Sequence, residues 1–211
     1  MQFAEELAKV LPNELPRRDE VIAKAAEHLA LIVEANQHFN LTRITTPREA
    51  AIKHVLDCVL PWRYFAEAEH VLDAGSGAGF PGIPLALVLP GTRFTLAESI
   101  QKRSRFLESC LDCMELHNVY VAAERAEDVL KRRRIDLITA RAVAPISRAI
   151  DFFAPALKNG AKALLFKGPD VESEIRDAEP HARKHKLRLR IVERYDLPDT
   201  MGGRTIVEIS R

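Results

Sequence analysis

The feature that most constrains the fold is an alternation of short apolar runs with helical stretches, which begins near residue 68. The runs are rich in Val, Ile, Leu and Phe and have the length of buried strands. This alternation predicts a parallel sheet that is covered by helices on both faces. The expected strands are residues 70–74, 93–97, 119–123, 135–140, 161–166, 188–195 and 205–209. The expected helices between them are residues 83–89, 100–116, 126–132, 145–157 and 172–185.

The end of the chain departs from this alternation. Residues 197–203 leave no room for a helix between the last two strands. We therefore expect these strands to pair as an antiparallel hairpin. A mostly parallel seven-stranded sheet with such a terminal hairpin is typical of Rossmann-like class I methyltransferases, an inference that rests on analogy of fold alone.

The N-terminal part is predicted to be almost entirely helical. Apolar residues from Val21 to Val33 recur at three- and four-residue steps, which marks the buried face of a helix. Asp19 or a neighbour is expected to cap this helix, and Pro47 suits the first position of another helix that continues to Leu60. We expect two parts, an N-terminal helical extension over residues 1–67 and an α/β domain over residues 68–211.

Composition excludes several classes of protein. The chain has 31 Lys and Arg against 30 Asp and Glu, so its formal net charge is +1, and any nucleic-acid face must be a local patch. Three Cys argue against a disulfide scaffold and suit a reducing compartment. The apolar stretches are too short to span a bilayer, and the N-terminus is acidic where an export signal is basic. We expect a cytoplasmic protein without a membrane partner.

A glycine-rich loop follows the first expected strand. The segment Val71-Leu-Asp-Ala-Gly-Ser-Gly-Ala-Gly-Phe-Pro-Gly82 places four glycines where the chain turns from strand to helix. Glycine permits positive φ and a close approach of the backbone to a ligand. The carboxyl end of the first strand is also where open α/β sheets bind their ligands. A plain tight turn is the simpler alternative.

Two cofactors compete for this loop. A dinucleotide fingerprint that starts at Gly75 needs glycine where Phe80 stands, although one that starts at Gly77 finds its glycines. Asp73 and the dense glycines suit S-adenosylmethionine better, because this cofactor has no pyrophosphate to seat on a helix N-terminus. We expect Gly75 and Gly77 to pass close to the cofactor and Phe80 to lie against its apolar side.

The second expected strand supplies a check on this interpretation. It ends at Glu98, 23 residues after Gly75. A carboxylate at this strand end accepts hydrogen bonds from both ribose hydroxyls of a bound nucleoside. The alternative is a solvated acid at the end of a strand. We favour the ribose contact because the glycine loop precedes it.

These residues carry a family resemblance. The chain resembles the bacterial RsmG (GidB) family of small-subunit rRNA methyltransferases over nearly its whole length. The phrase Gly-Phe-Pro-Gly-Ile-Pro after the glycine loop is the most specific match. The departures are mild, with Ala74 where many members carry Val and Glu98 where many carry Asp. The matching segments are Asn40-Leu-Thr, His54-Val-Leu-Asp57, the run from Asp73 to Leu85, Glu98-Ser, Lys102-Arg-Ser-Arg-Phe-Leu107, Arg141-Ala, Lys167-Gly and Gly203-Arg204.

The resemblance implies an activity and a set of contacts. The implied reaction is methylation of the N7 nitrogen of one guanine, guanine-527, in 16S rRNA, with S-adenosylmethionine as cofactor. The implied partner is this rRNA or a small-subunit assembly intermediate, bound by a monomer. The family's cofactor contacts fall on Gly75, Phe80, Ala126, Glu127 and Arg141. Ala126 and Glu127 fit the first turn of a helix equally well, because the helix dipole favours an acid there.

The implied chemistry makes few demands on acid–base groups. Guanine N7 has a free lone pair and no proton at neutral pH, so no general base is required. The tasks of the enzyme are orientation and exclusion of water. Arg141 ends the fourth expected strand, and we expect it to position cofactor or substrate, since a cation beside a nitrogen that becomes positive is unfavourable. A structural ion pair is the alternative.

Several further residues are candidates for contact with RNA. Lys167, which ends the fifth strand, and Asn40 are candidates for the base pocket, although a cap or turn suits Asn40 equally. Arg188 and Arg190 are expected on the face opposite the alternating apolar residues of their strand, where they would meet phosphates. Arg204, in a pair matched by the family, is assigned to RNA as well. The basic runs are residues 102–105, 131–134 and 183–190.

A cysteine motif and two alternative functions remain to be considered. Cys110, Cys113 and His117 have helical spacing and the chemistry of soft metal ligands, but core packing is the better interpretation of a mid-helix Cys pair, and no metal is expected. A methyltransferase that acts on another RNA, a protein or a small molecule is the first alternative function. An NAD(P)-dependent oxidoreductase is the second, which Phe80 and the terminal hairpin make weaker.

Overall fold

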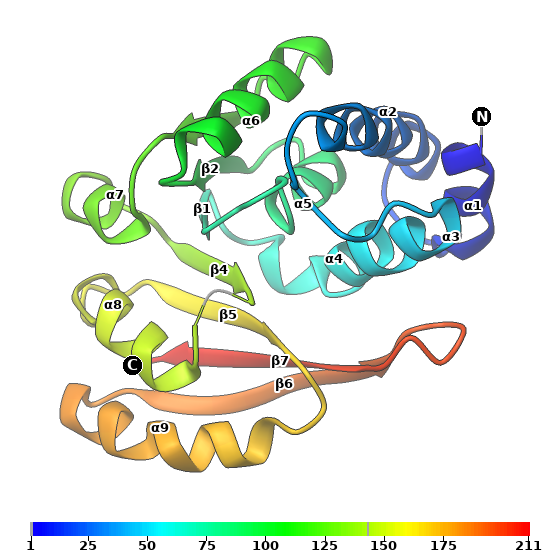
Figure 1. The fold of residues 1–211 in the computed structure, drawn as a ribbon. Helices are drawn as coiled ribbons and strands as arrows, with labels where there is room; N and C mark the ends of the chain where they lie inside the picture. Colours follow the sequence, from blue (N-terminus) through cyan, green and yellow to red (C-terminus); the bar gives the residue numbers. More distant parts are fainter. Residues whose placement is uncertain (1, 143) are drawn as a thin grey trace.

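The structure is a computed structural model that describes residues 2–142 and 144–211. Within these residues the chain forms a seven-stranded sheet of order β3-β2-β1-β4-β5-β7-β6 (Figure 1). The first five strands are mutually parallel, whereas β7 is antiparallel to both β5 and β6. The predicted terminal hairpin is confirmed. The strands are β1 His70–Ala74, β2 Arg93–Ala97, β3 Val119–Ala122, β4 Leu137–Arg141, β5 Lys162–Lys167, β6 Arg188–Asp196 and β7 Gly203–Ser210.

Helices cover both faces of the sheet, as the alternation predicted. One face packs against α7, α8 and α9 through an apolar cluster that includes Val129, Ile150 and Ala178. The other face packs against α5, α6 and the N-terminal helices. The helices of the α/β part are α5 Gly82–Val88, α6 Gln101–Cys113, α7 Ala126–Arg132, α8 Ile146–Lys158 and α9 Val171–His185.

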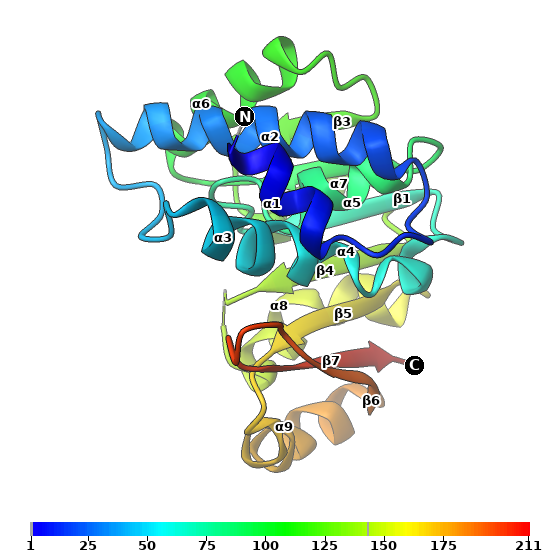
Figure 2. The ribbon, with the colours of Figure 1, turned by 90° about the vertical axis from the view of Figure 1, so that its right-hand side faces the viewer.

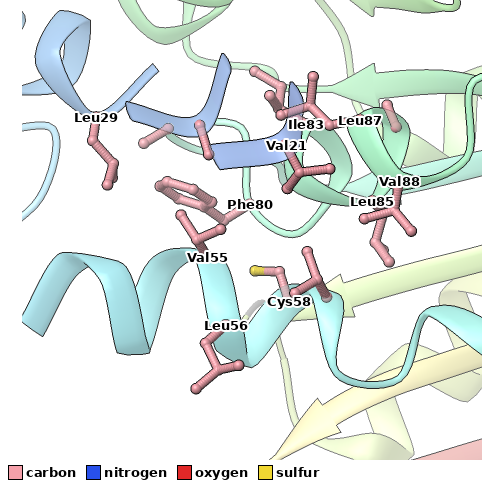
Figure 3. Close-up of a cluster of buried hydrophobic side chains, with 14 of the residues drawn as sticks. Val21, Leu29, Val55, Leu56, Cys58, Phe80, Ile83, Leu85, Leu87 and Val88 are labelled. Atoms are coloured by element: carbon pink, nitrogen blue, oxygen red, sulfur yellow. The ribbon is translucent and has the colours of Figure 1, made fainter. Parts of the chain in front are cut away.

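The N-terminal helices share one core with the sheet. These are α1 Gln2–Val10, α2 Arg18–Asn36, α3 Pro47–Ala50, a π-helical turn over Ala51–Leu56, α4 Asp57–Val59 and a 3-10 turn over Trp62–Phe65. Figures 1 and 2 show α1, α2 and α3 gathered on one side of the sheet. Figure 3 shows Leu29 and Val55 of this part beside Phe80 and Ile83 of the α/β part, all buried. The predicted boundary at residue 67 therefore lies between an all-helical part and an α/β part that share a continuous core.

Two local predictions about the N-terminal helices were wrong. Asp19 does not cap α2, because the residue before the helix is Arg17, which has φ +55°, and Asp19 lies in the first turn. The helix from Pro47 is interrupted by a π-helical turn over Ala51–Leu56. In this turn the Asp57 amide donates to the carbonyl of Ile52 instead of that of Lys53. The Lys53 carbonyl is left to accept a hydrogen bond from another element, and π-helical turns are frequent at functional sites.

Across the described ranges, no helix is both long enough and apolar enough to cross a lipid bilayer.

Candidate functional site

The glycine loop joins β1 to α5 through a buried carboxyl group. Asp73 is fully buried, and its Oδ2 accepts a hydrogen bond from the Gly82 amide at 2.9 Å. A Cβ atom at Gly82 would lie 2.7 Å from this oxygen and 2.3 Å from Leu96 Cδ2, so only glycine fits. Gly75 and Gly77 have φ of 70° and 60°, in the left-handed region that glycine adopts freely. The loop is thereby held open toward the carboxyl edge of the sheet.

The Asp73 carboxyl has an unusual environment. Its second oxygen, Oδ1, is buried without a hydrogen-bond partner among the described residues. Burial raises the pKa of Asp73 to about 7, although the Gly82 amide opposes this rise. At neutral pH the group is therefore poised between its protonated and ionised forms.

Glu98 connects the loop to the end of β2. The side chain is only 4% exposed. Its Oε2 accepts a hydrogen bond from the Gly77 amide at 3.1 Å, and its Oε1 accepts one from the Ile100 amide at 2.8 Å. A carboxylate oxygen accepts two hydrogen bonds. Each oxygen of Glu98 thus retains a lone pair for a ligand.

Four residues expected at the cofactor line one cavity of about 200 Å³. They are Gly75, Glu98, Ala126 and Glu127, which come from three successive strand ends. Phe152 and Phe153 of α8 close the same cavity. These two aromatic residues were not expected from the sequence, because a Phe pair in an amphipathic helix reads as ordinary core. Phe152 is nevertheless 36% exposed, which is high for a core residue.

The Phe80 ring does not lie where the sequence suggested. It is stacked on His54 with ring centroids 4.4 Å apart, and the ring of His28 lies 5.0 Å away on another element. Phe80 is not among the described residues that line the cavity of about 200 Å³. The aromatic side chain is buried in the core that the N-terminal helices share with the sheet.

Arg141, at the end of β4, faces the N-terminal helices. Its Nη1 donates to the Lys53 carbonyl at 2.7 Å, the group that the π-helical turn leaves open. The same nitrogen lies 3.5 Å from Asp57 Oδ2. Its guanidinium also lies 5.2 Å from the Phe80 ring centroid. Arg141 is therefore held rigidly beside the loop, and the ion pair that we considered as the alternative is present.

A second cavity, of about 340 Å³, opens next to Arg141. Its charged centre is Asp57, which is 1% exposed. The carboxylate of Asp57 accepts hydrogen bonds from Arg204 Nε at 3.0 Å and from the Tyr195 hydroxyl at 3.0 Å. The sequence did not single out Asp57 for a role, although it ends a segment that carried the resemblance. The lining residues are Ile44, Lys53, His54, Asp57, Arg141, Ala142, Phe166, Lys167, Gly168 and Arg204.

The family model described as rRNA small subunit methyltransferase G (GidB) matches residues 21–199 of this chain. The chain belongs to this family. A ribosomal RNA small subunit methyltransferase G of Solibacter usitatus is 64% identical over 209 residues, which cover 99% of this chain and all of the relative. One of Carboxydothermus hydrogenoformans is 39% identical over 183 residues, which cover 84% of this chain and 77% of the relative. The match decides against the oxidoreductase alternative.

Solved structures agree with this methyltransferase fold. An O-methyltransferase from Bacillus cereus in complex with SAH has a TM-score of 0.59 at 18% identity and covers 88% of this chain and 91% of its own. The O-methyltransferase TomG from Streptomyces achromogenes in complex with SAM has a TM-score of 0.58 at 19% identity, covering 88% and 90%. At these identities the likeness establishes the Rossmann-like fold alone.

In this member of the GidB family, Lys167 and Asn40 are the two residues that the sequence offered for the base pocket, and of these the described lining of the second cavity includes Lys167 only. Lys167 lines it, while its Nζ donates to the Ala144 carbonyl at 2.8 Å and lies 2.8 Å from Glu174. Asn40 is exposed in the loop that follows α2. The loop is instead organised by Asn36, whose Oδ1 accepts the amides of Leu41 and Thr42.

Arg188 and Arg190 are far from both cavities. They lie at the start of β6, which runs parallel to β5 because both strands are antiparallel to β7. The start of β6 is therefore at the amino edge of the sheet, whereas the cavities lie at the carboxyl edge. Arg190 also lies 3.4 Å from Glu208. The alternation that exposes both arginines was predicted well, but it carried no information about which edge they occupy.

The two cysteines of α6 in this methyltransferase lie in different environments. Cys110 is buried in the core and Cys113 is exposed. Cys113 is the last residue of α6, so the pair is not mid-helix as the sequence suggested. Core packing describes Cys110 only. Among the described residues no three His, Cys, Asp or Glu side chains are grouped to hold a metal ion.

Proposed function

We propose that this protein transfers a methyl group from S-adenosylmethionine to the N7 nitrogen of a guanine in 16S rRNA. The observation that carries the proposal is the pair of cavities at the carboxyl edge of the sheet, on either side of the end of β4, in a chain of the GidB family. One cavity has the groups that recognise a nucleoside with a positive charge. The other has the charges that recognise RNA.

The first cavity fits S-adenosylmethionine by its donor set. The spare lone pairs of Glu98 are available to the two ribose hydroxyls, and Gly75 allows a close approach of the backbone to the amino-acid part. Ala126 and Glu127 begin α7, and a backbone amide and a side chain there would hold the adenine. When bound, the cofactor supplies an electrophilic methyl group on a positively charged sulfur.

The second cavity fits an anionic, planar acceptor. Arg141 and Arg204 are held by the Asp57 carboxylate between them, so their remaining guanidinium N–H groups have fixed directions. A fixed guanidinium donates well to guanine O6 or to a phosphate oxygen. Lys167 adds a third cation to the wall of the cavity. These groups orient the base and exclude water, which is the work that an in-line attack by N7 requires.

A histidine in this cavity takes no part in proton transfer. His54 lines the wall, but burial lowers its pKa to about 3, with Arg141 adding to the effect. The imidazole is therefore neutral at physiological pH. Guanine N7 has no proton to lose, so the reaction needs no general base. A neutral His54 therefore fits a reaction in which the acceptor nitrogen has no proton to give up.

The proposal is tested by methylation in vitro of small ribosomal subunits that lack the modification. Borohydride and aniline cleave RNA at 7-methylguanosine, so primer extension on treated 16S rRNA is expected to stop at one guanine. Methyl incorporation without such a stop would assign the transfer to another atom. Incorporation into no ribosomal RNA would reject the substrate. Calorimetry with S-adenosylhomocysteine tests the cofactor independently.

A further inference from the structure

A basic surface lies on the amino edge of the sheet, opposite the two cavities. Strand starts, the ends of α8 and α9 and the C-terminus meet at this edge, around the C label of Figure 1. Nine exposed cationic residues at this edge lie in no ion pair among the described residues, whereas Arg190 at the same edge lies 3.4 Å from Glu208. We call these residues the amino-edge cations: Arg93, Arg133, Arg134, Lys158, Lys162, Lys184, Lys186, Arg188 and Arg211.

The amino-edge cations differ from their neighbours in having no carboxylate partner. In the part of the chain that the structure describes, none of the nine lies in an ion pair. The contrast is sharp within single basic runs. Lys131 pairs with Asp128, Arg132 with Glu124 and Arg183 with Glu179. The nine amino-edge cations thus lack a direct carboxylate partner, whereas the adjacent cations have one.

Two hollows are lined by these cations. One, of about 280 Å³, is lined by Lys158, Lys184, His185, Lys186 and Arg211, with no Asp or Glu side chain among its described lining residues. The other, of about 550 Å³, is the larger and includes Arg133, Arg134, Asn159 and Asp136. Asp136 is engaged by the His70 amide at 2.9 Å. Lys158 of the first hollow and Asn159 of the second are consecutive residues at the end of α8.

Helix capping accounts for only part of this surface. Cations at a helix C-terminus interact favourably with its dipole. This covers Lys158 at the end of α8, Lys184 and Lys186 at the end of α9, and Arg133 at the end of α7. It does not cover Lys162 and Arg188, which begin strands, or Arg211, which follows β7. A surface with several uncompensated cations around two hollows suits a ligand with repeated negative charges.

We propose that the amino edge is a second RNA-binding surface, which takes backbone phosphates of folded 16S rRNA away from the guanine that is methylated. This inference rests on the proposed function. β5 has six residues, so at about 3.3 Å per residue the edges are about 17 Å apart along this strand. The segment of RNA held here is therefore distinct from the acceptor nucleotide. The surface contributes to substrate affinity and not to the methyl transfer itself.

The test compares two triple variants that remove equal charge. The first is Lys158→Gln with Lys184→Gln and Lys186→Gln, in which the cations lack partners. The matched control is Lys131→Gln with Arg132→Gln and Arg183→Gln, in which each cation has a carboxylate partner. For the first variant we expect KM for small subunits to rise about tenfold, with kcat unchanged. The salt slope of its binding to a 16S rRNA transcript is expected to fall by about 2.

The control is expected to change KM and the salt slope much less. An equal effect in both variants, or none in the first, would overturn the proposal. So would a loss of kcat or of S-adenosylhomocysteine affinity in the first variant, since the edge would then act on the catalytic site. If wild-type protein methylates no rRNA, the proposed function fails separately. Filter binding of the transcript to the two variants still decides on the surface in that case.

Discussion

The two cavities at the carboxyl edge differ in charge and in how the chain builds them. The first has three carboxylates and one guanidinium in its lining, from Glu98, Glu124, Glu127 and Arg125. The second has four cations and one carboxylate, Asp57. The acidic cavity suits a positively charged cofactor, and the basic one suits RNA. The acidic cavity and the basic cavity thus lie on either side of the end of β4.

The cavities also differ in the span of sequence that they use. The first is made chiefly from the loops after β1, β2 and β3. The second joins the π-helical turn, the ends of β4 and β5 and the start of β7. A cavity built from successive strand ends is visible as a motif. A cavity built from distant segments depends on the N-terminal helices being docked, which makes it sensitive to changes in the core.

The largest expected effect is on the cofactor side of this comparison. Glu98→Ala removes the carboxylate that holds Gly77 and Ile100 and that we assign to ribose. We expect affinity for S-adenosylhomocysteine to fall about 100-fold, roughly 3 kcal/mol, because charged hydrogen bonds are lost. Calorimetry measures the change. Glu98→Gln keeps one oxygen acceptor and is expected to lose less. Unchanged affinity of the Ala variant would remove the cofactor assignment.

The second-largest expected effect concerns the second cavity and tests whether it acts independently of the first. Asp57→Asn leaves Arg141 and Arg204 without their shared carboxylate. We expect the free energy of unfolding to fall by about 2–3 kcal/mol, less than for a fully buried pair because both arginines are partly exposed. Methylation is expected to slow while affinity for S-adenosylhomocysteine is retained.

Tyr195→Phe is the matched control for Asp57. It deletes one hydroxyl that donates to Asp57 and leaves both ion pairs intact. We expect a loss of about 1 kcal/mol in urea unfolding. If Asp57→Asn weakened cofactor binding as strongly as methylation, the two cavities would not be separate functional units.

A third effect is a dependence of stability on pH that arises from His28, a buried residue of α2. Burial lowers the pKa of His28 to about 4, from a usual value of 6.5. The fold prefers the neutral imidazole, so its contribution is present above pH 6.5 and is lost as pH falls toward 4. We expect the stability lost between pH 7 and pH 5 to include about 2 kcal/mol from this residue.

The variant His28→Gln tests this pH dependence. Its amide is able to donate to the Ala78 carbonyl, which the His28 Nε2 contacts at 2.8 Å. Urea midpoints of the variant are expected to change less between pH 7 and pH 5 than those of the wild type. An identical slope in both proteins would assign the acid sensitivity to another group, such as His54.

The smallest expected effect is for the ion pairs of Arg48, which link the β6–β7 loop to the N-terminal helices. Arg48 joins Asp199 in the β6–β7 loop at 2.7 Å and Glu6 of α1 at 3.2 Å. These groups are on the surface, where solvent screens ion pairs and their contribution is small. We expect Arg48→Ala to leave the melting temperature and methylation unchanged within error. A large loss in either would show that the hairpin tip holds the N-terminal helices in place.

Sequence reasoning worked best where the information was local. The bounds of β1, β2 and α7 were predicted to the residue, and Gly75, Glu98, Ala126 and Glu127 were placed together correctly at one edge. It worked worst for side chains whose neighbours are distant. The Phe80 ring turns into the core because His28 and His54 lie there, and no pattern around residue 80 contains this fact.

The sequence by itself determined the alternating architecture, the glycine loop and the acidic strand end, because periodicity and glycine spacing are properties of neighbouring residues. The tertiary structure decided the acceptor cavity and the basic amino edge. Asp57 and Arg204 are 147 residues apart in the chain, yet their side chains are 3.0 Å apart in the fold. Only the docking of the N-terminal helices and the terminal hairpin on one sheet brings such groups together, since burial of their shared apolar core selects that arrangement.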